Sequence, residues 1–334
     1  MSHITSQEIR LTQRPVGLPK PDDFEVATVS LPEPGSGEIL VRNRFISVDP
    51  YMRGRMVDRK SYTPPFQLGE ALTGGCVGEV IQSNHEGFTE GDHVLGMLGW
   101  REAYLSDGKG LQKIDPSLAP LQSFLGTMGM PGMTAYFGLL EIGKPQAGET
   151  VFVSAAAGAV GSIVCQIAKI KGCRVVGSAG TAAKIAWLEE IGVDVAINYK
   201  DVDNLTHVLG QACPDGLDIY FENVGGEHLQ AALAIANNQA RIPFCGMIAQ
   251  YNATEPVPGP NNLGNIIGKR LLLQGFIVSD FMADSNRFYQ EMGQWIQEGK
   301  ITWQETIVDG VENTPQAFIG LFSGENLGKM VVKV

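Results

Sequence analysis

Apolar segments alternate with amphipathic segments from residue 151 onward. The apolar runs that predict strands are Val151–Ser154, Arg174–Ser178, Val195–Tyr199, Leu217–Val224, Ala240–Ile248 and Leu271–Val278. Segments with helical spacing separate them, one after Gly158 and others at 182–191, 204–212, 227–237 and 262–269. Apolar, β-branched strands that alternate with helices are typical of a parallel, doubly wound sheet with right-handed crossovers. We therefore expect an α/β unit with a six-stranded parallel sheet over residues 125–301.

The first 120 residues have a different pattern, in which short alternating segments are separated by turns rich in proline and glycine. Examples are Glu38–Val48, Gly78–Gln82 and His93–Met97. This pattern predicts a β-barrel. Residues Met330–Val334 return to it after a helix predicted at 285–299. We therefore expect residues 1–124 and 302–334 to form one β-rich domain, into which residues 125–301 are inserted.

Charge and cysteine content exclude several classes of partner. The chain has 25 Lys and Arg against 36 Asp and Glu, a net charge of −11, and no basic run. Nucleic acid and anionic membranes are therefore poor partners. The five cysteines are scattered without Cys-x-x-Cys spacing, which predicts buried thiols in a reducing compartment. The polar stretch Met1–Pro15 lacks the apolar core of a signal peptide and favours the cytoplasm.

Two uncharged stretches, Ser117–Leu140 and Thr150–Ala168, reach the roughly 18 to 20 residues that can span a bilayer. The first contains Pro120 and Pro131, and the second has glycines where a strand should turn into a helix. We therefore interpret both as buried elements of a soluble fold.

The junction Ser154–Gly161 has the sequence Ser-Ala-Ala-Ala-Gly-Ala-Val-Gly, a degenerate dinucleotide fingerprint with Ala156 in place of the first glycine. Gly158 would let the backbone approach a pyrophosphate, and Gly161 would let the helix pack on the strand. The amides and positive dipole of the helix N-terminus would face the phosphates. A glycine pattern alone could be a tight turn, but its place after the first of six predicted strands favours a Rossmann cofactor site at Gly158, Ala159, Val160 and Gly161.

The end of the second strand indicates which nicotinamide cofactor binds. An NAD enzyme presents an acid to the ribose 2′-hydroxyl there, whereas Ser178–Thr181 contains none. Lys184 follows in the first turn of the next helix, where its ammonium can pair with a 2′-phosphate. The alternative is an ordinary solvated lysine. The missing acid is a separate observation, and together the two features favour NADPH.

Several segments resemble the prostaglandin reductase, plant alkenal double-bond reductase and bacterial curcumin reductase group of the medium-chain reductase superfamily. The similar segments span nearly the whole chain: 48–53, 129–136, 155–162, 197–200, 221–226, 245–248, 275–278 and 326–329. The resemblance implies a GroES-like β-barrel domain, an inserted NADPH-binding Rossmann domain and a homodimer. The dimer would continue the sheet through the predicted edge strand Leu271–Val278.

The resemblance also implies individual cofactor contacts. Gly158–Gly161 would lie under the pyrophosphate, Lys184 and Tyr199 around the adenosine 2′-phosphate, and Asn223 near the ribose. The nicotinamide side would be flanked by Cys245, Gly246, Met247, Ile248, Tyr251, Phe276, Ile277 and Val278, with Asn326 reaching the cofactor from the returning tail. Asn223 and Asn326 lie beside glycines and also fit turns, and Phe276 also fits a plain core position.

No metal site is expected. Zinc alcohol dehydrogenases of the wider superfamily carry Gly-His-Glu at a barrel strand, whereas Gly74–Gly78 contains no histidine and the Tyr51 segment stands where a metal-binding cysteine would be. The five histidines are dispersed. Without a Lewis acid or a Tyr-x-x-x-Lys pair, direct ketone reduction lacks an electrophile. Reduction of a carbon–carbon double bond conjugated to a carbonyl is less demanding, because the negative charge delocalises onto the carbonyl oxygen.

The residues expected at the substrate are Tyr51, Met130 and the proline-containing loop Gln250–Asn262, which has the length of a lid. Tyr251 is the candidate catalytic residue, because a neutral tyrosine hydroxyl at the carboxyl end of a strand can donate to an enolate oxygen. Tyr51 is the second candidate, and Tyr251 could instead only pack on the cofactor.

Three functions stay open at this point. The first is an NADPH-dependent reductase of α,β-unsaturated ketones and aldehydes, with a small apolar substrate. The second is a quinone reductase, which shares the cofactor site, although the Tyr51 and Tyr251 segments favour the first. The third is an NADPH-binding protein without turnover.

Overall fold

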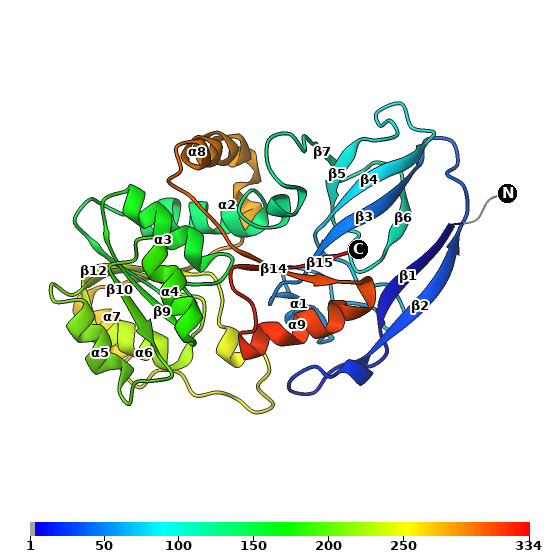
Figure 1. The fold of residues 1–334 in the computed structure, drawn as a ribbon. Coiled ribbons are helices and arrows are strands. Elements are labelled where there is room, and N and C mark those ends of the chain that lie inside the picture. Colours follow the sequence, from blue (N-terminus) through cyan, green and yellow to red (C-terminus); the bar gives the residue numbers. More distant parts are fainter. Residues whose placement is uncertain (1–3) are drawn as a thin grey trace. The chain divides into compact units, whose positions relative to one another are not determined.

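The computed structural model describes residues 4–334, which divide into two compact units. The first unit contains the residues up to Leu125 together with Glu305–Val334, and the second contains Gly126–Gln304. Figure 1 shows the helices and strands of both units with their labels. None of the helices in residues 4–334 combines the length and the apolar character needed to cross a membrane.

The second unit is built on a six-stranded parallel sheet, which confirms the predicted doubly wound architecture. The strands, in spatial order, are β10 (Val195–Asn198), β9 (Arg174–Ala179), β8 (Thr150–Val153), β11 (Leu217–Phe221), β12 (Ala236–Phe244) and β13 (Leu272–Gly275). The chain reverses its direction of travel across the sheet between β8 and β11. In doubly wound sheets, ligands bind at the carboxyl ends of the strands beside such a reversal.

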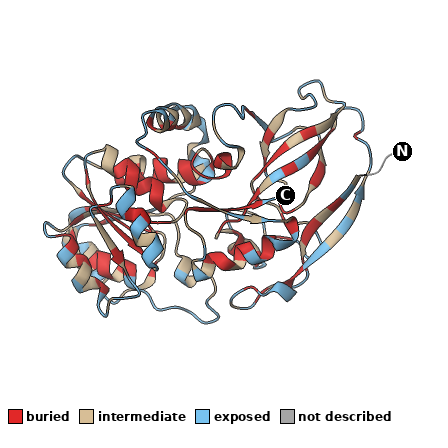
Figure 2. Ribbon diagram, in the orientation of Figure 1, coloured by how far each residue is buried: buried red, intermediate tan, exposed pale blue. Residues whose placement is uncertain are grey.

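Helices cover both faces of this sheet (Figure 1). They are α2 (Met130–Phe137), α3 (Gly161–Ile170), α4 (Ala182–Glu190), α5 (Leu205–Ala212), α6 (Gly226–Ile235), α7 (Gly264–Lys269) and α8 (Ser285–Gln297). On one face, α5 packs against α6 over a core that includes Phe152, Leu209 and Tyr220. Figure 2 shows the strands of the sheet largely buried, as their apolar sequences require.

Two strand predictions were wrong at their ends. Strand β12 ends at Phe244, not at Ile248, because the amides of Cys245 and Gly246 turn away and donate to the carbonyl of Glu222. Strand β11 ends at Phe221 rather than Val224, because the amides of Val224 and Gly225 turn back onto the Glu222 carboxylate. Both corrections place residues expected in strands on loops at the carboxyl edge of the sheet.

A third correction concerns β13, which stops at Gly275, so the predicted strand to Val278 is too long. Residues Val278–Asp284 instead form a 3-10 helix. The pattern also did not predict α2 or the π-helix Gly138–Gly143 that follows it. Pro131 occupies the first turn of α2, where a missing amide is tolerated. Position 138 requires glycine, because the Cβ of any other residue would lie 2.4 Å from the Phe276 ring.

The first unit is β-rich. Strands β1 (Ile4–Leu11) and β2 (Phe24–Leu31) form an antiparallel ribbon. A seven-stranded sheet has the order β14 (Glu305–Asp309), β15 (Lys329–Lys333), β3 (Ile39–Ser47), β4 (Cys76–Ser83), β5 (His93–Gly96) and β7 (Gln112–Ile114), with β6 (Ala103–Ser106) also on β3. The short helix α1 (Met52–Arg55) follows β3, and α9 (Thr314–Ser323) lies between β14 and β15.

Strand β15 lies between β14 and β3, so segments from opposite ends of the sequence share one sheet. Val331 pairs with Ser47 and Lys333 with Phe45 in an antiparallel register, whereas β14 and β15 pair in parallel. The core beneath includes Ile9, Trp100 and Phe318, which are fully buried. The β-rich unit therefore depends on the returning segment for its interior.

Candidate functional site

The turn after β8 brings the predicted glycine fingerprint to the carboxyl edge of the sheet. Ala155 adopts a left-handed backbone conformation with φ of 48°, and the next amide, that of Ala156, donates to the carbonyl of Ser178 at 2.9 Å. The loop is thereby tied to the end of β9. Since Ala156 occupies the position of the usual first glycine, the tight turn is made here by a strained alanine one residue earlier.

Gly161 begins α3 in close contact with this turn. A Cβ at Gly161 would lie 2.4 Å from the carbonyl oxygen of Ala155, so no larger residue fits. The first amides of a helix have no acceptor within it and form an anion-binding end. Gly158–Gly161 therefore forms a tight backbone turn, which we call the glycine cradle, at the position predicted for a pyrophosphate.

Two lysines and a tyrosine gather beside the end of β9. Lys184 lies in the first turn of α4. The side-chain oxygen of Thr181, the N-cap residue of this helix, accepts a hydrogen bond from the Lys184 backbone amide at 3.4 Å. A Cβ at Gly180 would lie 3.1 Å from the Tyr199 hydroxyl and 3.0 Å from Cε of Lys200. The structure thus brings together Lys184 and Tyr199, which sequence reasoning had grouped, and adds Lys200, which it had missed.

The electrostatics of this cluster suit an anion. Burial lowers the pKa of the Lys184 ammonium, and the positive charge of Lys200 lowers it further. A phosphate between the two ammonium groups would relieve their repulsion and stabilise both charged forms. The signal for Lys200 was present in the sequence, since it directly follows Tyr199 in a segment that resembles the reductases.

Asn223 is fixed against the fingerprint turn. Its side-chain amide donates to the carbonyl of Ser154 at 2.8 Å, and its backbone amide donates to the Ser154 hydroxyl at 3.0 Å. The side-chain oxygen is a hydrogen-bond acceptor, and these bonds hold it in a defined direction. Asn223 is therefore both a turn residue and a preorganised acceptor.

Glu222 was missed by sequence reasoning and organises the site from beneath. Its side chain is fully buried, and Oε1 accepts hydrogen bonds at 2.7 Å from the amides of Val224 and Gly225 and from the Tyr220 hydroxyl. Oε2 has no partner within residues 4–334. Burial raises the pKa of this carboxyl, and the amide and hydroxyl donors oppose that rise. No sequence signal distinguished this glutamate from a surface residue after a strand.

The segment Cys245–Ile248 lies against the Glu222 turn. The amides of Cys245 and Gly246 donate to the Glu222 carbonyl, and that of Ile248 donates to the Asn223 carbonyl at 3.1 Å. Burial raises the pKa of the Cys245 thiol to about 12, with a smaller effect from Glu222. The thiol is therefore neutral at physiological pH and contributes shape rather than charge.

Tyr251 follows a short 3-10 helix, Ile248–Gln250, and folds back over this segment. Its hydroxyl oxygen lies 3.3 Å from the amide nitrogen of Met247, which donates to it. This bond fixes the position of the hydroxyl beside the segment Cys245–Ile248. Residues 253–259 beyond it are exposed and lack regular structure, as expected for the predicted loop.

In the predicted segment Phe276–Val278, the Phe276 side chain packs within the second unit, and the backbone of Ile277 and Val278 leaves strand β13. The Phe276 ring makes edge contacts with Phe221 and Phe281, at centroid distances of 6.3 and 6.5 Å. The ring is half-buried and packs against aromatic side chains of the second unit. The chain at Ile277 and Val278 leaves β13 near the carboxyl edge, where its backbone could face a cofactor.

Two further predicted residues, Tyr51 and Asn326, lie in the first unit. Tyr51 precedes α1, and burial followed by the charge of Asp49 raises the pKa of its hydroxyl, which also accepts a hydrogen bond from Arg55. Tyr51 is therefore neutral at pH 7. The side-chain amide of Asn326 donates to the Gly328 carbonyl at 2.7 Å and shapes a local turn.

Potential metal ligands do not cluster. Within residues 4–334, no group of three or more histidine, cysteine, aspartate or glutamate side chains is arranged to hold a metal ion. The segment Gly74–Gly78 is the one compared above with the histidine motif of zinc enzymes. At Gly74, a Cβ would lie 2.4 Å from the methyl of Met52. Apolar packing fills that region instead.

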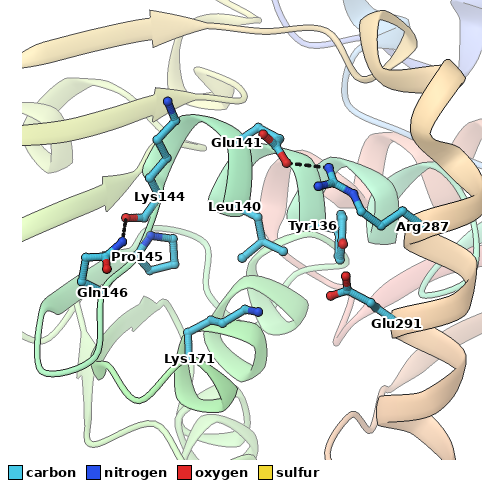
Figure 3. Close-up of a pocket in the computed structure, with 9 residues that line it drawn as sticks. All are labelled: Tyr136, Leu140, Glu141, Lys144, Pro145, Gln146, Lys171, Arg287 and Glu291. Carbon is cyan, nitrogen blue, oxygen red and sulfur yellow. Dashed lines mark hydrogen bonds and ion pairs between the residues drawn. The ribbon is translucent and has the colours of Figure 1, made fainter.

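Met130 opens α2 and is 36% exposed, so it is not a core residue. Further along the same helical segment is a cavity of about 480 Å³, whose lining side chains are drawn in Figure 3. It is lined by Tyr136, Leu140, Glu141, Lys144, Pro145, Gln146, Lys171, Arg287 and Glu291. Glu141 pairs with Arg287 there, and Pro145 and Gln146 precede β8. The cavity therefore lies at the amino edge of the sheet, opposite the fingerprint turn.

Comparison with known proteins agrees with this geometry. Residues 7–114 match the family described as the N-terminal domain of oxidoreductase, and residues 159–298 match the zinc-binding dehydrogenase family. The chain is 47% identical over 330 residues to the NADPH-dependent curcumin reductase of Escherichia coli, covering 97% of this chain and 95% of that protein. It is 47% identical over 323 residues to prostaglandin reductase 1 of Bos taurus, covering 95% and 96%.

A solved structure supports the same relationship. The crystal structure of CurA from Vibrio vulnificus in complex with NADPH superposes with a TM-score of 0.93 at 45% identity, covering 98% of this chain and 99% of that chain. The match spans both units of the molecule described above.

Proposed function

The chain belongs to the zinc-free medium-chain reductases that include curcumin reductase, prostaglandin reductase and 2-alkenal reductase, and from this we propose that it reduces the carbon–carbon double bond of α,β-unsaturated ketones and aldehydes with NADPH. One observation carries the proposal. The glycine cradle, the Asn223 acceptor and the Lys184–Lys200 pair lie along one sheet edge, in the order that a pyrophosphate-linked dinucleotide with a 2′-phosphate requires.

The chemistry divides between cofactor and protein. NADPH, when bound at this edge, supplies a hydride for the β-carbon of the substrate. The electron pair of the double bond then moves to the α-carbon and the carbonyl oxygen, giving an enolate that takes a proton from water at the α-carbon. What the protein must provide is a donor that stabilises the negative oxygen until protonation.

Tyr251 is the donor that we propose for the enolate oxygen. Its hydroxyl oxygen accepts a hydrogen bond from the Met247 amide, which holds the ring over the segment Cys245–Ile248 at the carboxyl edge of the sheet. A tyrosine hydroxyl can donate as well as accept. Tyr51 is the second candidate, since its neutral hydroxyl belongs to a predicted substrate segment. If Tyr251 only packs on the cofactor, the ribose 2′-hydroxyl and water would stabilise the oxygen.

The substrate that fits these residues is apolar. Tyr51, the exposed Met130 and the loop Gln250–Asn262 would line its site, and methionine and aromatic side chains adapt to varied apolar shapes. The contacts proposed for the nicotinamide side are those of Cys245–Ile248, the backbone at Phe276–Val278, and Asn326.

The test is steady-state oxidation of NADPH with a panel of enones, alkenals, quinones and saturated aldehydes, in the presence and absence of a strong chelator. We expect turnover of enones and alkenals that the chelator does not change. Turnover of quinones alone would identify a quinone reductase. NADPH binding without turnover of any compound would support a non-catalytic role, and activity lost to the chelator and restored by zinc would contradict metal independence.

We also propose that the protein is a cytoplasmic homodimer. Strand β13 is the edge of the parallel sheet, and apolar side chains near it are exposed, with Ile267 83% and Leu272 50% exposed. An exposed apolar edge strand is a pairing surface. All five cysteines are free thiols, in keeping with a reducing compartment. Sedimentation should give a dimer that Leu272→Lys weakens, and a wild-type monomer would contradict the proposal.

A further inference from the structure

A buried ion pair in the first unit lies between two segments assigned to the site. Lys329 is 4% exposed and Asp49 is 6% exposed. The Lys329 ammonium lies 3.0 Å from Oδ1 of Asp49 and donates to the Val48 carbonyl at 2.7 Å. The Ser47 hydroxyl donates to Oδ2 of the same carboxylate at 2.5 Å. Both charges are therefore withdrawn from water and satisfied by specific partners.

The pair lies where the backbone pairing of β3 and β15 ends. The antiparallel register sets Val331 opposite Ser47, and continuing it by two residues in each strand would set Lys329 opposite Asp49. No backbone rung joins β3 and β15 beyond Val331 within the described residues. The side chain of Lys329 bridges the strands there instead, with its contacts to Val48 and Asp49.

Beyond the pair, each strand enters a turn that carries a proposed site residue. Asp49 is two residues before Tyr51, and the Asp49 carbonyl accepts the amide of Met52 at 3.1 Å in the turn that starts α1. Lys329 is three residues after Asn326, whose side chain bonds to the Gly328 carbonyl. One ion pair therefore joins the bases of the two turns.

Stability alone does not account for this arrangement. Two charges removed from water lose most of their mutual attraction to desolvation, so a buried pair is commonly no more stabilising than apolar residues of the same size. What a buried pair supplies that apolar contacts do not is a defined geometry, because each hydrogen bond fixes a direction as well as a distance.

We propose that Asp49 and Lys329 are positioning residues whose ion pair holds the Tyr51 turn and the Asn326 turn in one fixed arrangement for substrate and cofactor. The inference rests on the proposed function for the roles of Tyr51 and Asn326. The pair itself touches neither ligand in this account and acts through the two turns.

The test uses the full-length protein with both charges removed, Asp49→Asn together with Lys329→Met, so that no charge is left buried alone. We expect this double variant to keep a melting temperature close to that of the wild type. The KM for an enone should rise about tenfold or more, and the dissociation constant for NADPH, measured by fluorescence, should rise severalfold. Lys329→Arg keeps the charge and should restore much of both values.

Hydrogen exchange gives a readout that does not depend on activity. In the double variant, the amides of residues 51–56 and 326–329 should exchange about tenfold faster or more, while the strands β4 and β5 should not change. If the double variant fails to fold, the same exchange and kinetic measurements on Asp49→Glu decide the question, since this variant keeps both charges and alters the geometry of the pair. Asp49→Glu should then raise KM and speed exchange in both turns, and wild-type values for it would overturn the inference.

A matched control is the Glu149–Arg241 pair of the second unit, in which the atoms are 2.6 Å apart. Glu149→Gln with Arg241→Met should lower the melting temperature and leave KM and NADPH affinity unchanged. Unchanged KM, NADPH affinity and exchange in the Asp49/Lys329 double variant would overturn the inference. Failure of the wild type to bind NADPH would instead overturn the proposed function, and the exchange result would still test the positioning role.

Discussion

Two regions along the carboxyl edge of the parallel sheet hold polar groups in opposite ways. Around Glu222 the groups are buried and bonded to one another, with amides and the Tyr220 hydroxyl converging on one carboxylate oxygen. Around Lys184 the groups are cationic and reach solvent, with Tyr199 38% exposed. The first region uses its hydrogen bonds within the protein and so fixes the shape of the loops. The second holds two ammonium groups near one another, and its proposed ligand is the 2′-phosphate of the cofactor.

The largest expected effect comes from removing the buried acceptor. Glu222→Leu leaves the amides of Val224 and Gly225 and the Tyr220 hydroxyl without their shared partner. Each unsatisfied buried donor costs about 1 to 3 kcal/mol, so the free energy of unfolding should fall by roughly 3 to 5 kcal/mol in urea titrations. Glu222→Gln retains an acceptor oxygen and should lose less. Equal stability of Glu222→Leu and wild type would mean that the region is not organised by this carboxylate.

His228 lies between the two regions and provides a test by pH. It is buried against Phe152 and Tyr199, and burial lowers the pKa of its imidazole to about 4. The unfolded chain therefore takes up a proton on this side chain near pH 6.5, before the folded protein does. Stability attributable to His228 is full above that pH and falls by about 3 kcal/mol as the pH decreases to 4.

Comparison with His228→Phe isolates this effect from other titrating groups. The raised pKa of Glu222 acts in the opposite direction, because its protonated form is favoured in the folded state, but it is common to both proteins. The variant should therefore lose less stability than the wild type between pH 6.5 and 4. Parallel stability curves for the two proteins would show that His228 is not held neutral.

The cationic region should control the choice of cofactor. Lys184→Ala removes a charge-assisted contact to the 2′-phosphate, worth about 1.5 to 3 kcal/mol, and should weaken NADPH binding roughly ten- to a hundredfold. NADH affinity should hardly change. Lys200→Ala should act in the same direction with a smaller loss, because Lys200 is more exposed. Equal losses for NADPH and NADH would refute the assignment of this cluster to the 2′-phosphate.

Tyr251→Phe tests the chemical step without altering the Glu222 region or the Lys184 region. If the hydroxyl stabilises the enolate oxygen, kcat should fall about ten- to a hundredfold, with NADPH affinity nearly unchanged, as for other oxyanion donors. The matched variant Tyr51→Phe examines the second candidate. An unchanged kcat for Tyr251→Phe would leave that side chain only a packing role.

The sequence predicted the parts of this molecule that repeat. Buried strands such as Val151–Val153 are apolar along their length, and their alternation with helices was enough to predict a six-stranded doubly wound sheet, which is confirmed. The same periodicity misplaced the ends of β11 and β12. There, amides of Val224, Gly225 and Cys245 bond to Glu222 and draw the chain out of the sheet, a contact that periodicity does not encode.

The residues of the candidate site also fall into those that the sequence pattern indicated and those that depend on contacts made by the fold. Gly158, Gly161 and Lys184 were recognisable because their spacing after a strand has a physical meaning. Lys200 was missed although it directly follows Tyr199 in a segment that resembles the reductases. Glu222 was missed because its role comes from donors that the fold assembles around it. The Asp49–Lys329 pair joins positions near opposite ends of the sequence, and only the pairing of β3 with β15 brings them together.

The place of β15 in the first sheet also has a consequence for synthesis on the ribosome. The second unit is continuous over Gly126–Gln304 and can fold as soon as it emerges, whereas β3 must wait for a partner at Val331. During that interval β4 and β6 can already pair with β3, but its end at Phe45–Ser47 lacks a partner, and the apolar surface beneath that end is open to chaperones or to a neighbouring nascent chain. Ribosomal pausing before residue 329 should therefore prolong an aggregation-prone state in which the cofactor domain is already complete.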